Sequence, residues 1–239
     1  MSAIDAVVAA VEMLEDDPLY NAGYGSKIQS DGKIRMSASL MDGAKRRFSG
    51  CVNVENIKNP IRLAEKLLAE ENRVLAEKGA ELFAKKKLLK FASPYSEERL
   101  REYRRQKRGK SGTVGAIALD KKGRLAAATS TGGRGFEFPH RVSDSPTVAG
   151  NFSNQYCALS TTGTGEEIVE FAVAAKICSL VEIGVSLDDA AKMLLSQAIK
   201  AKAQFGFIAL DFSGNYIGVT ATRHLTWAAA HSKGFEIHA

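Results

Sequence analysis

Apolar residues recur along the chain with two different periods, and together they predict alternating groups of helices and strands. Apolar residues three and four positions apart predict helices over residues 4–14, 61–77, 79–90, 166–180 and 187–202. Short apolar runs predict strands over residues 27–39 (as a hairpin), 51–54, 113–120, 125–130, 158–161, 205–211 and 216–222. This order of elements favours an α+β protein in which helices cover sheets.

Turn and capping residues support several of these boundaries. Pro60 stands at the start of one predicted helix, where its missing N–H costs nothing, and Ser186 is a good N-cap for the last helix. Glycine-containing segments at 121–124 and 213–215 join consecutive strand-like runs, as tight hairpins do. The sequence NAGYGS at 21–26 is a glycine-rich turn, and the whole of 1–239 is expected to form one domain.

The composition is that of an ordinary globular protein, with 45% hydrophobic and 25% charged residues among 239. No apolar run approaches the roughly 20 residues that span a bilayer, and the first residues do not resemble a secretory signal. Cys51, Cys157 and Cys178 are far apart, which fits reduced thiols, and the histidines lack metal-ligand spacing. We therefore expect a cytoplasmic protein with no membrane partner and no metal site built from side chains.

The net charge of +6 arises from one segment of the chain. Between Lys85 and Lys110 lie eleven basic and three acidic residues, so the remainder of the chain is slightly acidic. Tyr95 and Tyr103 are the aromatic residues nearest to the densest charge, whereas nucleic-acid-binding surfaces interleave more aromatic residues with basic ones. We interpret residues 85–112 as a solvated basic linker, and binding of nucleic acid or an acidic partner is the alternative.

The peptide bond between Gly112 and Thr113 separates this charged stretch from an apolar, strand-like run. A cut at this bond gives Thr113 a free α-amine, whose pKa of about 8 in model peptides lets it accept the proton of the hydroxyl near pH 7. One residue then supplies both the nucleophile and the base, as in N-terminal threonine hydrolases. The alternative is a plain linker followed by a strand.

Two polar segments after Thr113 carry residues that packing alone does not require. The sequence TSTGG at 129–133 ends a predicted strand, where catalytic groups often lie; the alternative is a simple turn. Arg141 and Asp144 stand three residues apart in a loop, where arginine can bind a carboxylate by two hydrogen bonds and aspartate can bind an ammonium group. Together they suit the α-amino acid end of a substrate, although a loop salt bridge is the alternative.

Two further segments are candidates for binding a developing oxyanion. The sequence TGTGE at 162–166 leads into a predicted helix, whose first N–H groups and a threonine hydroxyl can stabilise negative charge; an ordinary helix cap is the alternative. The segment lacks the lysine of a phosphate-binding loop. Asn21 lies in the glycine-rich turn, where its amide could donate to an oxyanion or simply favour the turn.

Six segments taken together resemble the plant-type L-asparaginases and isoaspartyl aminopeptidases, which are N-terminal-nucleophile hydrolases. They are LEDDPLYNAGYGS (14–26), MDG (41–43), GTVGA (112–116), ATSTGG (128–133), RVSDSP (141–146) and TGTGE (162–166). The resemblance covers nearly the whole chain, from about residue 3 to about residue 230. It implies a four-layer αββα sandwich that cleaves itself into chains 1–112 and 113–239.

The resemblance also implies roles for individual residues. It makes Thr113 the nucleophile, Thr131 its supporting threonine, and Gly112 and Thr113 the cleavage site. It makes Arg141 and Asp144 the substrate's carboxylate and amine ligands. The oxyanion hole, which also contacts the substrate, corresponds to Thr162 and Gly163, and Asn21 lies beside the cleavage site. The family's mature unit is a dimer of cleaved protomers, a heterotetramer, and a sodium ion is often held by backbone carbonyls corresponding to those from Leu14 to Tyr24; no other cofactor is expected.

The chain departs from the family pattern at three places. It begins after the family's first strand and helix, so we expect this form to be poorly soluble, slow to cleave itself and weakly active. Ser37 stands where the family usually has aspartate, and residues 204–207 (QFGF) stand where the family has a glycine-rich segment. The expected function is hydrolysis of the side-chain amide of L-asparagine or of β-aspartyl dipeptides. The alternatives are a truncated, non-catalytic paralogue and a binder acting through residues 85–110.

Overall fold

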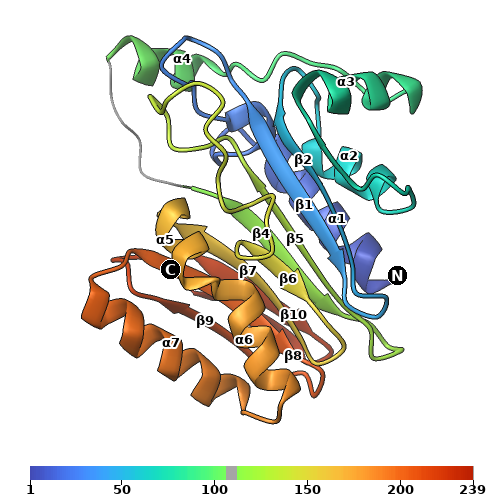
Figure 1. Ribbon diagram of the computed structural model, residues 1–239, viewed down its shortest axis with the longest axis vertical. Coiled ribbons are helices and arrows are strands. Elements are labelled where there is room, and N and C mark those ends of the chain that lie inside the picture. The colour runs from blue at the N-terminus through green and yellow to red at the C-terminus, as the bar shows by residue number, and fades with distance from the viewer. Residues whose placement is uncertain (106–111, 239) are drawn as a thin grey trace.

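A five-stranded sheet forms one half of the molecule in the computed structural model, which describes residues 1–105 and 112–238 (Figure 1). Within these residues its strand order is β3-β2-β1-β5-β4. The strands are β1 (Met36–Asp42), β2 (Arg47–Val54), β3 (Val74–Ala76), β4 (Val114–Leu119) and β5 (Leu125–Thr131). Strands β2 and β3 pair in parallel, and the other neighbours are antiparallel.

A second sheet forms the other half, with four strands in the order β6-β7-β8-β9 among the described residues. These strands are β6 (Asn151–Ser153), β7 (Cys157–Gly163), β8 (Phe205–Asp211) and β9 (Tyr216–Thr220), all antiparallel to their neighbours. A separate hairpin is made of β10 (Trp227–His231) and β11 (Gly234–His238).

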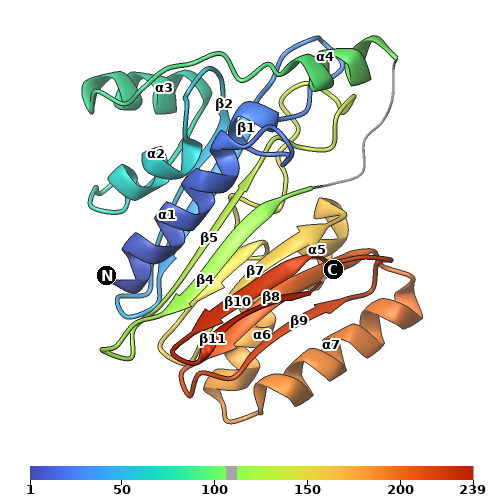
Figure 2. The ribbon, with the colours of Figure 1, turned by 180° about the vertical axis from the view of Figure 1, so that it is seen from behind.

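Helices cover the outer face of each sheet, while the inner faces meet (Figures 1 and 2). Helices α1 (Ala3–Asp16) and α2 (Pro60–Leu67) bury their apolar side chains against the first sheet. Helices α6 (Val173–Glu182) and α7 (Leu187–Ala201) do the same on the second sheet. The prediction of a mixed α+β protein is therefore confirmed.

The inner faces of the two sheets contact each other through an apolar cluster that includes Leu125 and Ala158, and through small and polar side chains. Thr129 Oγ1 on β5 lies 2.7 Å from Ser160 Oγ on β7. Gly115 on β4 permits this approach, since a Cβ built there would lie 1.9 Å from Ser160 Oγ. These contacts fix the position of β5 relative to β7 and hence of the residues that follow on each strand.

Helix starts follow the capping signals of the sequence. Ser2 Oγ accepts a hydrogen bond from Asp5 N, and Ser2 N donates one to the Asp5 carboxylate, a capping box that begins α1. Pro60 occupies the start of α2, and Ser186 Oγ caps α7 through Asp189 N. The helices predicted at 4–14 and 187–202 are confirmed within two residues at each end.

Several predicted elements are wrong in extent. The strand predicted over 51–54 begins at Arg47, and the helix predicted over 79–90 spans Glu77–Lys86. Residues 27–35 form a turn, with Gln29 N donating to Lys33 O, and β1 begins only at Met36. The helix predicted over 61–77 ends at Leu67, because the chain then forms β3 and pairs with β2. The helix predicted over 166–180 is divided into α5 (Gly165–Phe171) and α6, because Ala172 adopts a left-handed conformation with φ of 49°. Strands β6, β10 and β11 were not predicted.

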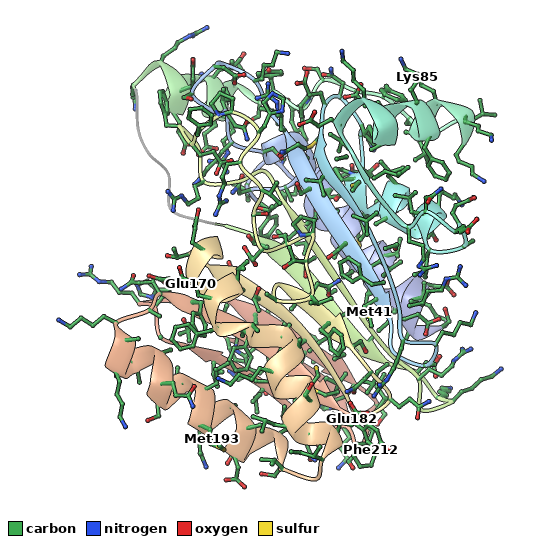
Figure 3. All side chains as sticks on the ribbon, in the orientation of Figure 1. Met41, Lys85, Glu170, Glu182, Met193 and Phe212 are labelled. Carbon is green, nitrogen blue, oxygen red and sulfur yellow. The ribbon has the colours of Figure 1, made fainter. Side chains whose placement is uncertain are left out.

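The basic segment contains folded structure as well as solvated chain. Helix α3 (Glu77–Lys86) ends inside it, and Lys85 projects outward at the edge of the molecule (Figure 3). Helix α4 (Glu97–Arg104) follows, and its Arg99 is only 7% exposed. The interpretation of 85–112 as solvated linker therefore does not fit α4, and its part at 106–111 lies outside the described residues.

Candidate active site

The hydroxyl groups of Thr113 and Thr131 are neighbours in the structure. Thr113 directly precedes β4, and the antiparallel register that pairs Val114 with Ser130 brings Thr113 alongside the end of β5. Thr113 Oγ1 donates to Thr131 Oγ1 across 3.3 Å, and Thr131 Oγ1 also accepts a hydrogen bond from Gly133 N at 3.1 Å. The predicted nucleophile therefore lies beside a hydroxyl whose own orientation is fixed by the backbone.

Asn21 connects the glycine-rich turn to the end of β5. It is buried, and its Nδ2 donates to Gly133 O while its Oδ1 accepts from Lys27 N at 3.0 Å. Its backbone oxygen accepts from Gly132 N at 2.9 Å. A Cβ built on Gly112 would lie 3.1 Å from Asn21 Cβ, so the structure places Asn21 beside the predicted cleavage site. The turn itself includes the short 3-10 helix η1 (Gly23–Gly25).

Asp144 is a buried carboxyl group in the loop between β5 and β6. It is 3% exposed, and its Oδ2 accepts a hydrogen bond from Thr161 Oγ1 at 2.9 Å. Burial raises the pKa of Asp144 to about 6, against the opposing effects of the Thr161 hydrogen bond and the charge of Arg141. A carboxylate in such a position can pair with a cation that replaces its lost water.

Arg141 is surrounded by acidic side chains. Its Nε and Nη2 donate to the two carboxylate oxygens of Glu166 at 3.0 and 2.8 Å, and its Nη1 donates to Glu137 at 3.2 Å. Glu166 also accepts from Arg134 at 3.3 Å. Arg141 thus forms salt bridges with Glu137 and Glu166, and not the loop salt bridge with Asp144 that the sequence suggested as an alternative.

Gly165 allows Arg141 and Asp144 to converge. A Cβ built on Gly165 would lie 2.6 Å from Arg141 Nη2 and 2.8 Å from Asp144 Oδ1. Both groups therefore approach the same backbone position at the start of α5. A cation and an anion that approach the same backbone position can bind the carboxylate and the ammonium group of one amino acid.

Thr162 and Gly163 end strand β7 directly before α5. Gly163 has a φ of 143°, and a Cβ there would lie 2.4 Å from Gln204 O, so another residue would strain the turn. Thr164 N donates to Gln204 O at 2.8 Å, so this helix-end N–H is not available to an oxyanion. The backbone of Thr162 and Gly163 is what remains of the predicted oxyanion site.

The predicted residues around Thr113 and those around Gly163 lie at the same end of the two sheets. Both views show the start of β4, which follows Thr113, beside α5, which follows Gly163 (Figures 1 and 2). The contact between Thr129 and Ser160 lies two residues before Thr131 on one strand and before Thr162 on the other. The structure thus brings together the predicted residues from before and after the basic segment.

Backbone carbonyl oxygens of the loop from Glu15 to Gly25 lie close to two of its glycines. A Cβ built on Gly23 would lie 2.2 Å from Glu15 O, and one built on Gly25 would lie 2.0 Å from Tyr20 O and 2.6 Å from Pro18 O. Backbone carbonyl oxygens are among the ligands that hard cations accept. Within 1–105 and 112–238, no cluster of histidine, cysteine and acidic side chains suits a metal ion.

Sequence reasoning missed several residues that shape the site. Glu137 and Gly150 lie in the loop between β5 and β6, Ser160 and Thr161 lie on β7, and nothing in their local sequence indicates that they contact predicted residues. Glu166, which pairs with Arg141, is different because it lies inside the TGTGE motif at 162–166. Ser37, one of the noted departures, accepts a hydrogen bond from Asn53 N and pairs with Thr131 across β1 and β5.

Within the described ranges, no helix is both long and apolar enough to cross a membrane.

Comparison with known proteins identifies the family. The family model described as asparaginase matches residues 1–238. An isoaspartyl peptidase/L-asparaginase from a Synechocystis strain is 40% identical over 233 residues, covering 90% of this chain and 71% of the relative. One of the same name from a Nostoc strain is 42% identical, covering 90% and 74%. A plant-type L-asparaginase from Pyrobaculum calidifontis is 41% identical over 198 residues, covering 75% and 66%. The chain therefore belongs to the asparaginase family, the family of amide hydrolases that the motifs around Thr113 resemble.

Proposed function

We propose that the chain is a threonine amidohydrolase that matures by cleaving itself between Gly112 and Thr113. The observation that carries this proposal is the hydrogen bond from Thr113 Oγ1 to Thr131 Oγ1, directly after a glycine that lies against Asn21. The names of the relatives support amide and isoaspartyl substrates. A domain of 1–239 thus yields chains 1–112 and 113–239, and the four-layer αββα arrangement of N-terminal-nucleophile hydrolases is the finer description of its fold.

In the maturation step, Thr113 Oγ1 attacks the carbonyl carbon of Gly112. The new C–O bond forms as the C–N bond breaks, so the acyl group moves from nitrogen to oxygen and the α-amine of Thr113 is released. Water then hydrolyses the ester, leaving a carboxylate on Gly112 and restoring the hydroxyl of Thr113. Gly112 suits this step because it has no Cβ to resist a distorted backbone.

In the catalytic cycle, the freed α-amine of Thr113 removes the proton from its own hydroxyl. The oxygen attacks the side-chain amide carbon of the substrate, and ammonia or the amine of the next residue leaves with the proton. Water then cleaves the acyl-enzyme ester to aspartate. Thr131 keeps Thr113 Oγ1 oriented throughout.

Arg141 and Asp144 select substrates that carry both a free α-carboxylate and a free α-ammonium group. L-asparagine and β-aspartyl dipeptides share this end, because in both the α-groups of aspartate are free and the bond to be cleaved is on the side chain. Thr162 and Gly163 would stabilise the oxyanion in catalysis, and Asn21 would be the corresponding residue beside Gly112 during maturation.

Two further features belong to this proposal. A sodium ion would be held by the carbonyls of Glu15, Pro18 and Tyr20, and its charge would hold the loop that carries Asn21. The mature enzyme would be a dimer of cleaved protomers in the cytoplasm, with small-molecule or dipeptide substrates and no other cofactor.

Mass spectrometry of the purified protein tests the proposal. We expect one fragment that begins at Thr113 and one that ends at Gly112, and Thr113→Ala should leave a single intact chain. The same fragments from Thr113→Ala would mean that an outside protease makes the cut. A wild-type chain that stays intact and inactive would support the non-catalytic paralogue, and salt-dependent binding to random duplex DNA would support the nucleic-acid alternative.

A further inference from the structure

Arg99 is the one buried residue of helix α4, whose other residues face solvent to a larger extent. A buried arginine is costly unless its N–H groups are bonded. Arg99 Nε donates to Gly25 O at 2.7 Å, Nη2 donates to Leu19 O at 3.3 Å, and Nη1 donates to both carboxylate oxygens of Glu102 at 3.0 Å. The side chain is therefore directed into the glycine-rich turn and carries its own counter-ion from the next turn of α4.

The two carbonyls that Arg99 binds lie on either side of Asn21. Leu19 precedes Asn21 by two residues and Gly25 follows it by four, so Arg99 joins the two ends of the loop that presents Asn21. From that loop, Asn21 reaches Gly132 and Gly133 at the end of β5 and contacts Gly112. A change in the loop would move the residue beside the predicted cleavage site.

Aromatic contacts hold α4 in this position. Tyr95 donates to Gly32 O at 3.1 Å, and Tyr103 donates to Ser30 O at 3.4 Å. The Tyr103 ring also stacks on Phe136 with ring centroids 4.8 Å apart. Helix α4 thus contacts both the segment that follows the Asn21 loop and the loop that follows Thr131, although it belongs to the basic stretch that leads to Gly112.

We propose that Arg99 is a positioning residue for Asn21, and that helix α4 is the part of the basic segment that prepares the site for self-cleavage. Arg99 touches no reacting atom and acts by holding the Leu19 and Gly25 carbonyls. The effect of Arg99 on self-cleavage rests on the proposed function. Its role in holding Asn21 can be tested without any cleavage.

The first experiment measures the rate of self-cleavage in matched variants. Arg99→Met removes the guanidinium and keeps much of the apolar stem, and Arg101→Met on the same helix removes an exposed arginine that pairs with Glu97. We expect Arg99→Met to form the fragment that begins at Thr113 roughly tenfold more slowly, and Arg101→Met to match the wild type. In an Asn21→Ala background, Arg99→Met should have no further effect, because the residue through which it acts is gone.

The second experiment measures hydrogen exchange in the uncleaved Thr113→Ala chain. The amides of Lys27 and Gly132 donate to Asn21, so they report its position. We expect both to exchange faster in the Arg99→Met variant and to be unchanged in the Arg101→Met variant.

Each outcome can be assigned to one of the two ideas. Unchanged exchange of these two amides in Arg99→Met overturns the positioning role, as does a cleavage defect that adds in full to that of Asn21→Ala. If the wild-type chain never cleaves but the exchange changes as expected, the proposed function fails and the role of Arg99 in holding Asn21 stands.

Discussion

The guanidinium of Arg141 and the carboxylate of Glu166 form a two-point ion pair, with Nε and Nη2 at 3.0 and 2.8 Å from the two carboxylate oxygens. Partial burial acts to raise the pKa of Glu166, but hydrogen bonds from Arg141 hold this pKa below its ordinary value. Together with Glu137, Glu166 fixes the plane of the Arg141 fork before any substrate arrives. A lysine ammonium group cannot bind both acids in this geometry.

Arg141→Lys should therefore raise the KM for L-asparagine by roughly tenfold or more while self-cleavage continues at its normal rate. The reason is that Arg141 binds the substrate's carboxylate in the proposed mechanism, and no substrate takes part in the proposed maturation. Steady-state kinetics and a time course on denaturing gels measure the two quantities. Arg134→Lys is the control, because Arg134 also pairs with Glu166 but should leave KM unchanged. An unchanged KM in Arg141→Lys would remove Arg141 from the substrate site.

Thr131→Val should slow self-cleavage and lower kcat by roughly tenfold or more, with little change in KM. Valine keeps the shape of threonine but cannot accept the hydrogen bond from Thr113 Oγ1. Thr129→Val is a matched control, because it removes a buried hydroxyl from the same strand that bonds Ser160 instead. Both variants should melt at lower temperature, and only Thr131→Val should lose activity. Equal kinetic losses in the two variants would mean that general stability explains the effect.

The activity of the mature enzyme should fall as the pH drops through about 6, where Asp144 takes up a proton. Protonated Asp144 cannot pair with the substrate's ammonium group, so kcat/KM should decrease about tenfold per pH unit below that point. Asp144→Asn should be weakly active and should lack this limb of the pH profile, while retaining any limb due to the Thr113 amine. A profile with the same limb in Asp144→Asn would assign the titration to another group.

Glu15 should make the fold less stable as the pH rises from about 4.5 to about 8. Burial raises its pKa to about 8, although hydrogen bonds from Ser130 Oγ and Ile61 N oppose the shift. In that pH range Glu15 keeps its proton when folded and loses it when unfolded, so each increase in pH favours the unfolded chain; the effect is absent below about 4.5 and constant above about 8.

Thermal melts of wild type and Glu15→Gln over this range test the assignment. Glutamine keeps the two hydrogen bonds without an ionisable group, so its curve should lack this part of the pH dependence. Glu12→Gln on the same helix changes a partly exposed residue that pairs with Arg62, and should keep the wild-type slope. Parallel pH curves for wild type and Glu15→Gln would show that Glu15 ionises normally.

The sequence was most informative where a signal is local. Apolar spacing predicted α1, and apolar spacing together with the Ser186 cap predicted α7, both within two residues. The helical spacing after Pro60 continued past Leu67, but there the chain forms β3, because pairing with β2 stabilises an extended segment whatever its helical propensity. The left-handed Ala172 that separates α5 from α6 carries no glycine signal, so one long helix was predicted.

The residues of the candidate site also divide into those that short sequence motifs indicate and those that only the fold brings to the site. Thr113, Thr131, Asn21, Arg141 and Asp144 were predicted because they lie in short motifs that resemble a family. The partners that orient them, such as Glu137 and Thr161, come from other segments and could be found only once the sheets were placed against each other. The burial that raises the pKa of Asp144 is likewise a property of the fold and not of its neighbours in sequence.

The pairing of β1 with β5 means that a cut before Thr113 does not release two independent pieces. Strand β1 belongs to the chain before the cut and β5 to the chain after it, yet they are hydrogen-bonded from Ser37 opposite Thr131 to Asp42 opposite Ala126. The seam between the two chains runs through the middle of one sheet. Maturation would therefore change the covalent connectivity while leaving an interlocked pair that co-elutes under native conditions, and neither chain would be expected to complete this sheet if expressed alone.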